Sequence, residues 1–230
     1  TMTRYVDIAR EVEEAHHQLR RNEQELSYMA YFDSLTGVRN RKSFYEEASR
    51  ALGLHNRTGE TPGVAVLYVD LDRFKEINDS YGHHVGDVVL QEVARRFKDN
   101  LRQSDDIYRL GGDEFLVYLS SLKDPADAGL VAQKLIDSLA EVITVAELTF
   151  YVGTCVGIAV YPDDGENVEA LVKAADRALY EAKKQRNTYR FFDAAMQQTS
   201  IRIVRLITGL RRAVAGDQLS LRYPPIYDAD

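Results

Sequence analysis

Acidic side chains stand at the ends of two apolar segments of this chain. Asp70 closes an almost unbroken apolar run, and Asp113 and Glu114 follow the paired glycines Gly111 and Gly112. A carboxylate at the end of a buried strand is costly unless a cation or hydrogen-bond donors meet it. We therefore expect these acidic residues to converge if the two segments pair as neighbours in one sheet.

A carboxylate cluster at such a place favours Mg²⁺ or Mn²⁺, because these hard cations prefer oxygen ligands. Such ions commonly take phosphate groups as further ligands. Gly111 and Gly112 carry no side chains, so a bulky group can approach the backbone there. The combination indicates metal-assisted chemistry on a nucleoside triphosphate. An acidic turn exposed to water is the alternative that spacing alone leaves open.

Further polar residues could recognise the rest of such a substrate. Asn78 and Asp87 are able to read a base edge through paired hydrogen bonds, although both types are also common in turns and caps. Lys183 and Arg186 could neutralise phosphates. Their alternative role is to complement the dipole at a helix C-terminus.

The apolar pattern predicts the elements that must position these residues. We expect helices over about 40–54, 86–101, 125–142 and 168–182, and strands over 64–71, 107–110, 115–119 and 148–161. Two glycines between the second and third strands predict a tight hairpin. The mixture predicts an α/β sandwich (α+β), with a central, mainly antiparallel sheet flanked by helices.

The N-terminal segment reads as one long helix from residue 4 to about 29. Apolar residues recur there at alternating steps of three and four, with Asn22 as the polar exception, which is the pattern of a heptad seam. We expect a parallel coiled coil that joins two chains into a homodimer. Packing of the same stripe on its own domain is the alternative.

Composition limits the classes of function. The chain has 230 residues, a net charge of −7 and one cysteine, so a generally basic nucleic-acid-binding surface and a thiolate metal cluster are not expected. No apolar run approaches the roughly 20 residues that a membrane span needs, and no signal peptide is visible. We expect a cytoplasmic setting, although a longer parent protein could be attached to a membrane upstream.

Several segments occur together in the order found in one family. The run Gly111-Gly-Asp-Glu-Phe115 resembles the signature of GGDEF domains, the diguanylate cyclase family. Segments that resemble its other motifs are Asp33-x-Leu-Thr-Gly-x-x-Asn-Arg41, Asp70-Leu-Asp-Arg-Phe-Lys-Glu-Ile-Asn-Asp79 followed by Gly82-His83 and Gly86-Asp87, and Ala175-Asp-x-Ala-Leu-Tyr-x-Ala-Lys183. The resemblance covers about residues 29–194 and implies the family's nucleotidyl-cyclase, palm-like fold.

The resemblance implies that two GTP molecules condense into cyclic di-GMP between two facing domains, with release of pyrophosphate. It places two Mg²⁺ (or Mn²⁺) ions in each half-site and guanine beside Asn78 and Asp87. By the same resemblance, the catalytic residues are Asp70, Asp113, Glu114 and Lys75; the metal ligands are Asp70, the carbonyl of Leu71, Asp113 and Glu114; and the further substrate contacts are Phe74, Lys75, Gly111, Gly112, Lys183 and Arg186.

Arg102 and Asp105 lie shortly before the glycine pair and resemble the family's RxxD site, where the product cyclic di-GMP binds and inhibits. A solvated Arg–Asp pair at a helix end is the alternative. One departure concerns Arg186, because the family's closing motif usually carries a glycine before its Arg-Asn pair and this chain has none.

The C-terminal segment runs from Leu210-Arg-Arg-Ala213 to Gln218-Leu-Ser-Leu-Arg-Tyr-Pro-Pro-Ile226. It resembles the start of an EAL domain, the cyclic di-GMP phosphodiesterase family, whose own motif would lie beyond residue 230. We therefore expect a signalling helix over 1–28, a GGDEF domain over 29–194, and a linker helix with the first EAL strand over 195–230. The alternative to an active cyclase is a catalytically silent GTP-binding module that regulates a downstream EAL phosphodiesterase.

Overall fold

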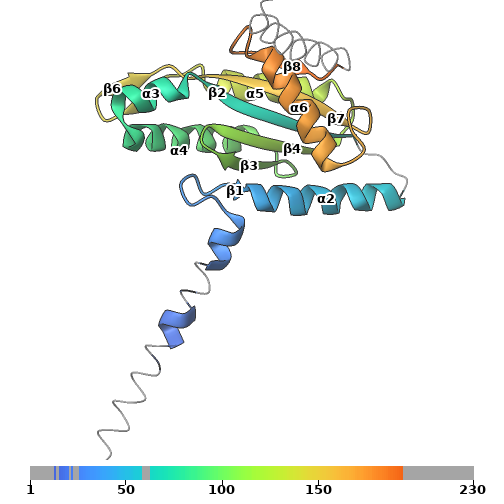
Figure 1. The fold of residues 1–230 in the computed structure, drawn as a ribbon, viewed down its shortest axis with the longest axis horizontal. Coiled ribbons are helices and arrows are strands. Elements are labelled where there is room, and N and C mark those ends of the chain that lie inside the picture. The colour runs from blue at the N-terminus through green and yellow to red at the C-terminus, as the bar shows by residue number, and fades with distance from the viewer. Residues whose placement is uncertain (1–12, 14–15, 21, 23–25, 59–62, 194–230) are drawn as a thin grey trace, which may run out of the picture. The chain divides into compact units, whose positions relative to one another are not determined.

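The computed structural model describes residues 13, 16–20, 22, 26–58 and 63–193. Its named elements belong to the first of two units, Thr1–Phe192. In chain order they are β1 (Arg39–Asn40), α2 (Arg41–Thr58), β2 (Gly63–Asp72), α3 (Phe74–Tyr81), α4 (His83–Asn100), β3 (Asp106–Gly111), β4 (Glu114–Leu122), α5 (Asp127–Ser138), β5 (Ile143–Val145), β6 (Leu148–Phe150), β7 (Gly153–Tyr161), α6 (Val168–Ala182) and β8 (Tyr189–Phe191). Figure 1 shows these elements along the chain.

A six-stranded sheet forms the centre of the domain, in the order β1-β3-β4-β2-β7-β8. The three central pairings, β3 with β4, β4 with β2 and β2 with β7, are antiparallel. The short edge strands β1 and β8 pair in parallel with β3 and β7. The predicted α/β sandwich with a mainly antiparallel sheet is therefore confirmed.

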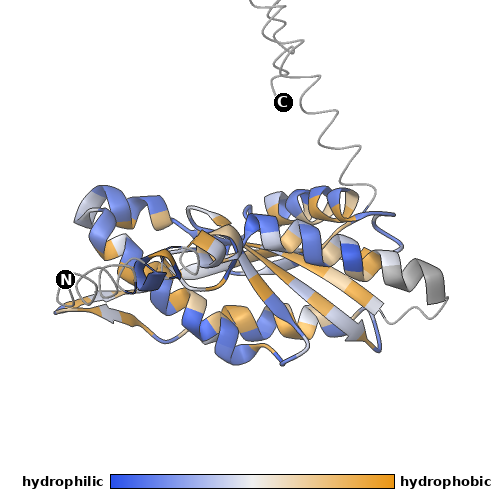
Figure 2. Ribbon diagram, turned by 90° about the horizontal axis from the view of Figure 1, so that it is seen from below, coloured by the Kyte–Doolittle hydropathy of each residue, from blue (hydrophilic) through white to orange (hydrophobic). Residues whose placement is uncertain are grey.

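Apolar residues cover both faces of this sheet, because the strands at its centre are buried on both sides. On β2, Leu67 and Val69 belong to the core beneath α4 and α5, whereas Val66 and Tyr68 belong to the core beneath α2 and α6. This alternation is the period of two that an extended strand imposes on its side chains. Figure 2 shows apolar residues along the strands and mixed faces on the surrounding helices.

The predicted strand over 148–161 is wrong in one respect. The alternation of apolar residues continues throughout, but the segment is divided into β6 and β7. The last residue of β2, Asp72, pairs with Gly153, so β7 has no β2 partner before that point. Residues Leu148–Phe150 instead pair with β5 in a separate two-stranded sheet. The pattern analysis also missed α3, whose eight residues are too few to show a helical period.

The expected N-terminal coiled coil is described only in part. Residues 13, 16–20, 22 and 26–31 are helical, and the apolar side chains of Leu19, Leu26 and Met29 are 56%, 67% and 61% exposed. The earlier residues of the heptad seam and the predicted elements after 194 lie outside the described residues. Within the described helices, none combines the length and the apolar character that crossing a bilayer requires.

Two buried tyrosines on neighbouring strands give a test of the core. The Tyr118 hydroxyl is buried and has no hydrogen-bond partner among the described residues, whereas the Tyr108 hydroxyl donates to Glu47 Oε2 at 2.8 Å. A buried hydroxyl without a partner costs free energy, because it has lost its hydrogen bonds to water.

We predict that Tyr118→Phe raises the free energy of unfolding by about 1 kcal/mol and that the control Tyr108→Phe lowers it by about the same amount. Urea unfolding followed by circular dichroism measures both changes. A loss of stability in Tyr118→Phe comparable to that in Tyr108→Phe would contradict the assignment of an unpaired hydroxyl.

Candidate active site at the hairpin between β3 and β4

The hairpin between β3 and β4 brings the predicted acidic residues beside β2. Gly111 and Gly112 form its turn with φ angles of 143° and 54°, which are conformations that favour glycine. Gly111 pairs with Glu114 across the hairpin, and Glu114 in turn pairs with Asp70 on β2. The predicted convergence at the end of the buried strand is confirmed for the backbone of these residues.

Asp70 lies at the centre of this cluster and is 8% exposed. Lys183 approaches it from the end of α6, with Nζ at 2.9 Å from Oδ2. Burial raises the pKa of the Asp70 carboxyl to about 6; Lys183 opposes this shift, and the charges of Asp113 and Glu114 add to it. One lysine thus faces several carboxylates, and the cluster carries excess negative charge.

Tyr68 adds a hydroxyl on the same face of β2. Burial raises the pKa of this phenol above its usual value, and the charge of Glu114 and a hydrogen bond with that carboxylate raise it further. Tyr68 therefore stays neutral and can hold Glu114 in place.

The chemistry of this cluster suits a divalent cation, because its donors are hard carboxylate oxygens with unbalanced charge. In this conformation, however, no three His, Cys, Asp or Glu side chains of the described residues are grouped as a metal site. The Asp70 carboxylate instead forms an ion pair with Lys183. The donor set fits a hard cation, while the side-chain positions are those of a lysine-paired site.

Asp72, the second acidic residue of β2, forms structural hydrogen bonds and does not join the Asp70 cluster. Its Oδ2 accepts the backbone N–H of Asn187 at 2.9 Å, and its Oδ1 accepts the Cys155 thiol at 3.3 Å. These bonds tie the end of β2 to the turn after α6 and to β7. They leave Asp70 as the β2 carboxylate that faces the hairpin.

The predicted base-recognition residues lie on two consecutive helices. Asn78 on α3 and Asp87 on α4 are both partly buried. Gly82 separates these helices with a φ of 85°, so the chain reverses within one residue. Asn78 also faces Gly86 on α4: a Cβ atom at Gly86 would stand 1.9 Å from Asn78 Oδ1.

The two residues expected to contact phosphates at the start of α3 differ in exposure. The side chain of Phe74 is 4% exposed and belongs to the core beneath α4, so only its backbone can meet a phosphate. Lys75 is exposed and free to do so. The phosphate contact that the resemblance implies for Phe74 can therefore involve only its main-chain atoms.

Arg109 is a residue of this site that the sequence analysis missed. Its guanidinium donates to Asp33 Oδ1 at 2.8 Å from Nη1, and to the carbonyl of Gly112 at 3.0 and 2.8 Å from Nε and Nη2. Asp33 also accepts the Thr36 hydroxyl at 2.6 Å. The hairpin turn is thereby attached to the segment before β1. The only sequence signal was a lone charge inside an apolar strand.

Arg186 lies apart from the carboxylate cluster. Arg186 lies just after α6 and has a φ of 60°, and the next residue, Asn187, has a φ of 45°. Two non-glycine residues therefore adopt conformations that favour glycine. With Asp72, Arg73 and Tyr151 it lines a different pocket, of about 550 Å³. No contact between Arg186 and Asp70, Asp113 or Glu114 is found in the described part of the chain, and its expected phosphate contact stays a prediction.

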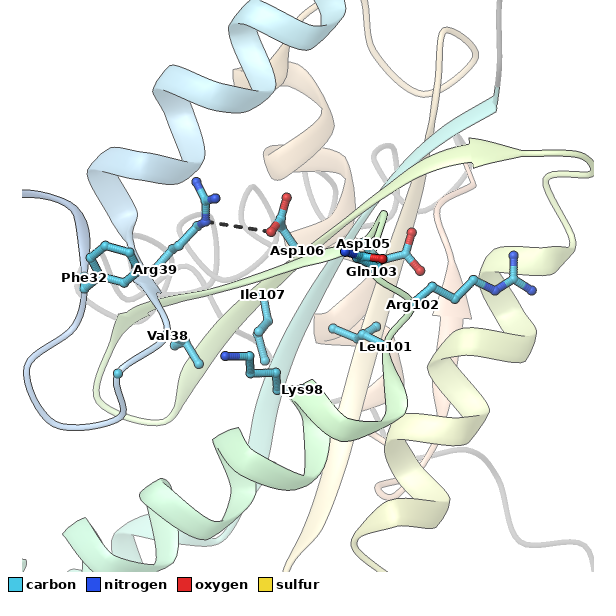
Figure 3. Close-up of a pocket in the computed structure, with 11 residues that line it drawn as sticks. Phe32, Val38, Arg39, Lys98, Leu101, Arg102, Gln103, Asp105, Asp106 and Ile107 are labelled. Carbon is cyan, nitrogen blue, oxygen red and sulfur yellow. Dashed lines mark ion pairs between the residues drawn. The ribbon is translucent and has the colours of Figure 1, made fainter.

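Arg102 and Asp105 line a pocket of about 410 Å³ at the start of β3, the end of that strand opposite the hairpin turn. Figure 3 shows Lys98 extending into this pocket from α4 and Phe32 closing its far side. Burial raises the pKa of the Asp105 carboxyl, and the charge of Arg102 partly opposes that shift. Arg39 and Asp106 form an ion pair at 3.7 Å across the same opening.

The sequence of this chain is similar to those of several known proteins that share one family. The bifunctional diguanylate cyclase/cyclic di-GMP phosphodiesterase MucR of Pseudomonas aeruginosa is 39% identical over 208 residues, which are 90% of this chain and 30% of MucR. The diguanylate cyclase TpbB of the same species is 44% identical over 161 residues, which are 70% of this chain and 37% of TpbB. The chain therefore spans about a third of the length of these relatives.

A solved structure containing only the GGDEF domain of TpbB shares the fold. It superposes with a TM-score of 0.70 at 42% identity and covers 74% of this chain and 98% of that chain. The family described as "Diguanylate cyclase, GGDEF domain" matches residues 30–188, which include the Asp70 strand, the glycine hairpin and the helix that carries Lys183. The chain belongs to the GGDEF diguanylate cyclase family.

Proposed function

We propose that this domain condenses two GTP molecules into cyclic di-GMP with release of two pyrophosphates. The observation that carries the proposal is the pairing of Asp70 with Glu114 across β2 and β4, with Asp113 in the adjoining turn and one lysine facing them. Such a charge-rich site at a glycine turn suits phosphoryl-group chemistry, because it can hold a cation and admit a triphosphate.

The residues that would hold the divalent cations are Asp70, Asp113, Glu114 and the backbone carbonyl of Leu71. When bound, Mg²⁺ or Mn²⁺ ions supply charge neutralisation at the α-phosphate and make a nearby hydroxyl more acidic. Lys183, now paired with Asp70, would be free to contact a phosphate if Asp70 held a cation. Lys75, exposed at the start of α3, is a second cation for the triphosphate.

The reaction needs two domains. In each half, the 3′-oxygen of one GTP bonds to the α-phosphorus of the other; the bond from that phosphorus to the bridging oxygen breaks, and pyrophosphate leaves. The hydroxyl proton passes to solvent. Each chain positions one GTP and neutralises its charge.

The N-terminal helix would bring two such domains together. Its apolar side chains Leu19, Leu26 and Met29 are exposed in the single chain, and they continue the heptad seam found in the sequence. Apolar residues at this spacing are covered when two helices form a coiled coil. We infer a homodimer in which the helices meet and the GGDEF domains face each other.

The pocket at Arg102 and Asp105 suits the proposed product. Its lining includes the basic side chains of Arg102 and Lys98, which could bind the phosphates of cyclic di-GMP, whereas Arg39 is already paired with Asp106 and Glu47. The side chain of Arg102 is exposed, and its charge acts on Asp105 without an ion pair at short range, so its guanidinium can form bidentate hydrogen bonds with a phosphate. Product binding there would inhibit further synthesis.

A regulatory role is the second candidate, and the similarity to the cyclic di-GMP phosphodiesterase NbdA of Pseudomonas aeruginosa favours it. NbdA is 39% identical over 202 residues of this chain, and its name gives a phosphodiesterase activity alone. A GGDEF domain joined to an EAL domain could bind GTP without turnover and regulate the EAL phosphodiesterase. The intact carboxylate cluster favours the cyclase.

We predict that the protein forms cyclic di-GMP from GTP and Mg²⁺, with a specific rate that rises with protein concentration because dimers are the active unit. Asp70→Asn and Glu114→Gln should each lower the rate at least about 100-fold, while the surface control Asp99→Asn keeps it. Chromatography of the products measures this. Retained turnover in both site variants would contradict the assigned roles, and GTP binding without pyrophosphate release would indicate the regulatory function.

We further predict that Asp70→Asn folds and is stabilised at pH 8 without divalent ions. The fold raises the pKa of this carboxyl, so its ionised form costs stability; the neutral amide should gain about 1 kcal/mol, allowing for solvent screening. Thermal and urea unfolding measure the gain. Added Mg²⁺ should stabilise the wild type but not the variant. A loss of stability would show that the Lys183 ion pair dominates.

We predict that Arg102→Ala accumulates more cyclic di-GMP than the wild type before synthesis stops, because the inhibitory pocket loses its main phosphate ligand. Initial rates at low product should stay equal. Arg95→Ala, on the exposed face of α4, is the control. Equal inhibition of the wild type and of Arg102→Ala by added cyclic di-GMP would place the product site elsewhere.

A further inference from the structure

Gly86 occupies a buried position inside α4 where only hydrogen fits. A Cβ atom added there would lie 1.9 Å from Oδ1 and 3.0 Å from Cγ of Asn78, and 3.1 Å from Cζ of Phe74. The first distance is far shorter than any van der Waals contact. The residue is helical, so its backbone conformation does not require glycine. The requirement is for space alone.

This glycine has a cost that needs a compensating reason. In a helix interior, glycine is about 1 kcal/mol less favourable than alanine. Gly53 in α2 offers a contrast, because a Cβ there would meet nothing within 4 Å. The space at Gly86 is instead filled by the amide of Asn78 from the neighbouring helix. The absence of a side chain at Gly86 therefore allows the Asn78 amide to lie against α4.

The Asn78 amide packs against Gly86, and its position follows from this close contact. Among the described residues it has no hydrogen-bond partner, although its side chain is partly buried between α3 and α4. Its backbone carbonyl accepts the N–H of Gly82 at 2.9 Å, which fixes the end of α3. Asp87 follows Gly86 directly in the chain. The close approach at Gly86 thus sets where the amide lies relative to this carboxylate.

We propose that Gly86 is a positioning residue for base recognition: by admitting the Asn78 amide against α4, it sets the spacing between that amide and Asp87. This inference rests on the proposed function. Guanine presents N1–H and an amino group on one edge, which a carboxylate and an amide oxygen can accept together. Adenine presents an unprotonated ring nitrogen at the corresponding place, so the same pair of acceptors disfavours it.

A methyl group at Gly86 would displace the amide or push the helices apart. Either movement separates Asn78 from Asp87 by a distance comparable to the clash and removes a hydrogen bond to the base. We expect Gly86→Ala to weaken binding of GDP about tenfold and to leave the weak binding of ADP unchanged. The selectivity between the two bases should therefore fall by the same factor.

The experiment is calorimetric titration of the full chain with GDP and ADP, which report base recognition without turnover. The variants are Gly86→Ala, Asn78→Ala, the double variant, and Gly53→Ala as a matched glycine-to-alanine change in a helix. If Gly86 acts through Asn78, the double variant binds GDP no more weakly than Asn78→Ala alone, because no amide remains to be displaced. Gly53→Ala should bind both nucleotides as the wild type does.

Additive losses in the double variant, or unchanged selectivity in Gly86→Ala, would overturn the inference. Failure of the wild type to prefer GDP would instead overturn the proposed function and this inference with it. Thermal unfolding gives a second test that does not need a ligand. If Gly86→Ala melts early, adding Asn78→Ala should restore much of the melting temperature, and a further loss would contradict the contact.

Discussion

The pairing of β2 with β4 is the constraint on which the site depends. Because side chains alternate along a strand, the register that sets Asp70 opposite Glu114 also decides which face both carboxylates share. A slip by one residue would turn Asp70 into the core beneath α4 and α5 and leave Glu114 without its partner. The apolar residues of β2, buried on both faces, make that slip costly, so the core secures the chemistry.

Charge balance explains several contacts around this register. The site gathers carboxylates with little opposing charge, and Lys183 relieves part of their repulsion at Asp70. Arg109, near the turn on β3, donates hydrogen bonds to both the carbonyl of Gly112 and Asp33. These bonds connect the hairpin turn to the segment before β1. The arrangement keeps negative charge concentrated at a turn that Arg109 holds by hydrogen bonds, with Lys183 beside it.

The base-recognition side of the site depends on close packing rather than on charge. The α3–α4 pair reverses at Gly82 and meets at Gly86, and both positions need glycine for different reasons, one conformational and one steric. The site thus combines a sheet register, which sets the carboxylates, with a helix contact, which sets the amide of Asn78. The end of β2 and the α3–α4 contact are adjacent at the start of α3, where Phe74 packs into the core.

Much of this protein followed from its sequence alone. Apolar periodicity indicated the long helices and the central strands, since burial patterns are local, and the acidic ends of β2 and of the glycine hairpin indicated the site. Tertiary structure decided the rest. Pairing partners divided the 148–161 segment, because β2 ends at Asp72; the Asp33–Arg109 contact joins residues far apart in the chain; and Gly86 faces Asn78 only once two helices pack. The first two have no local pattern, because each depends on which distant backbone arrives at the same place. Asn78 and Gly86 are close in the sequence, but their contact exists only when α3 packs against α4.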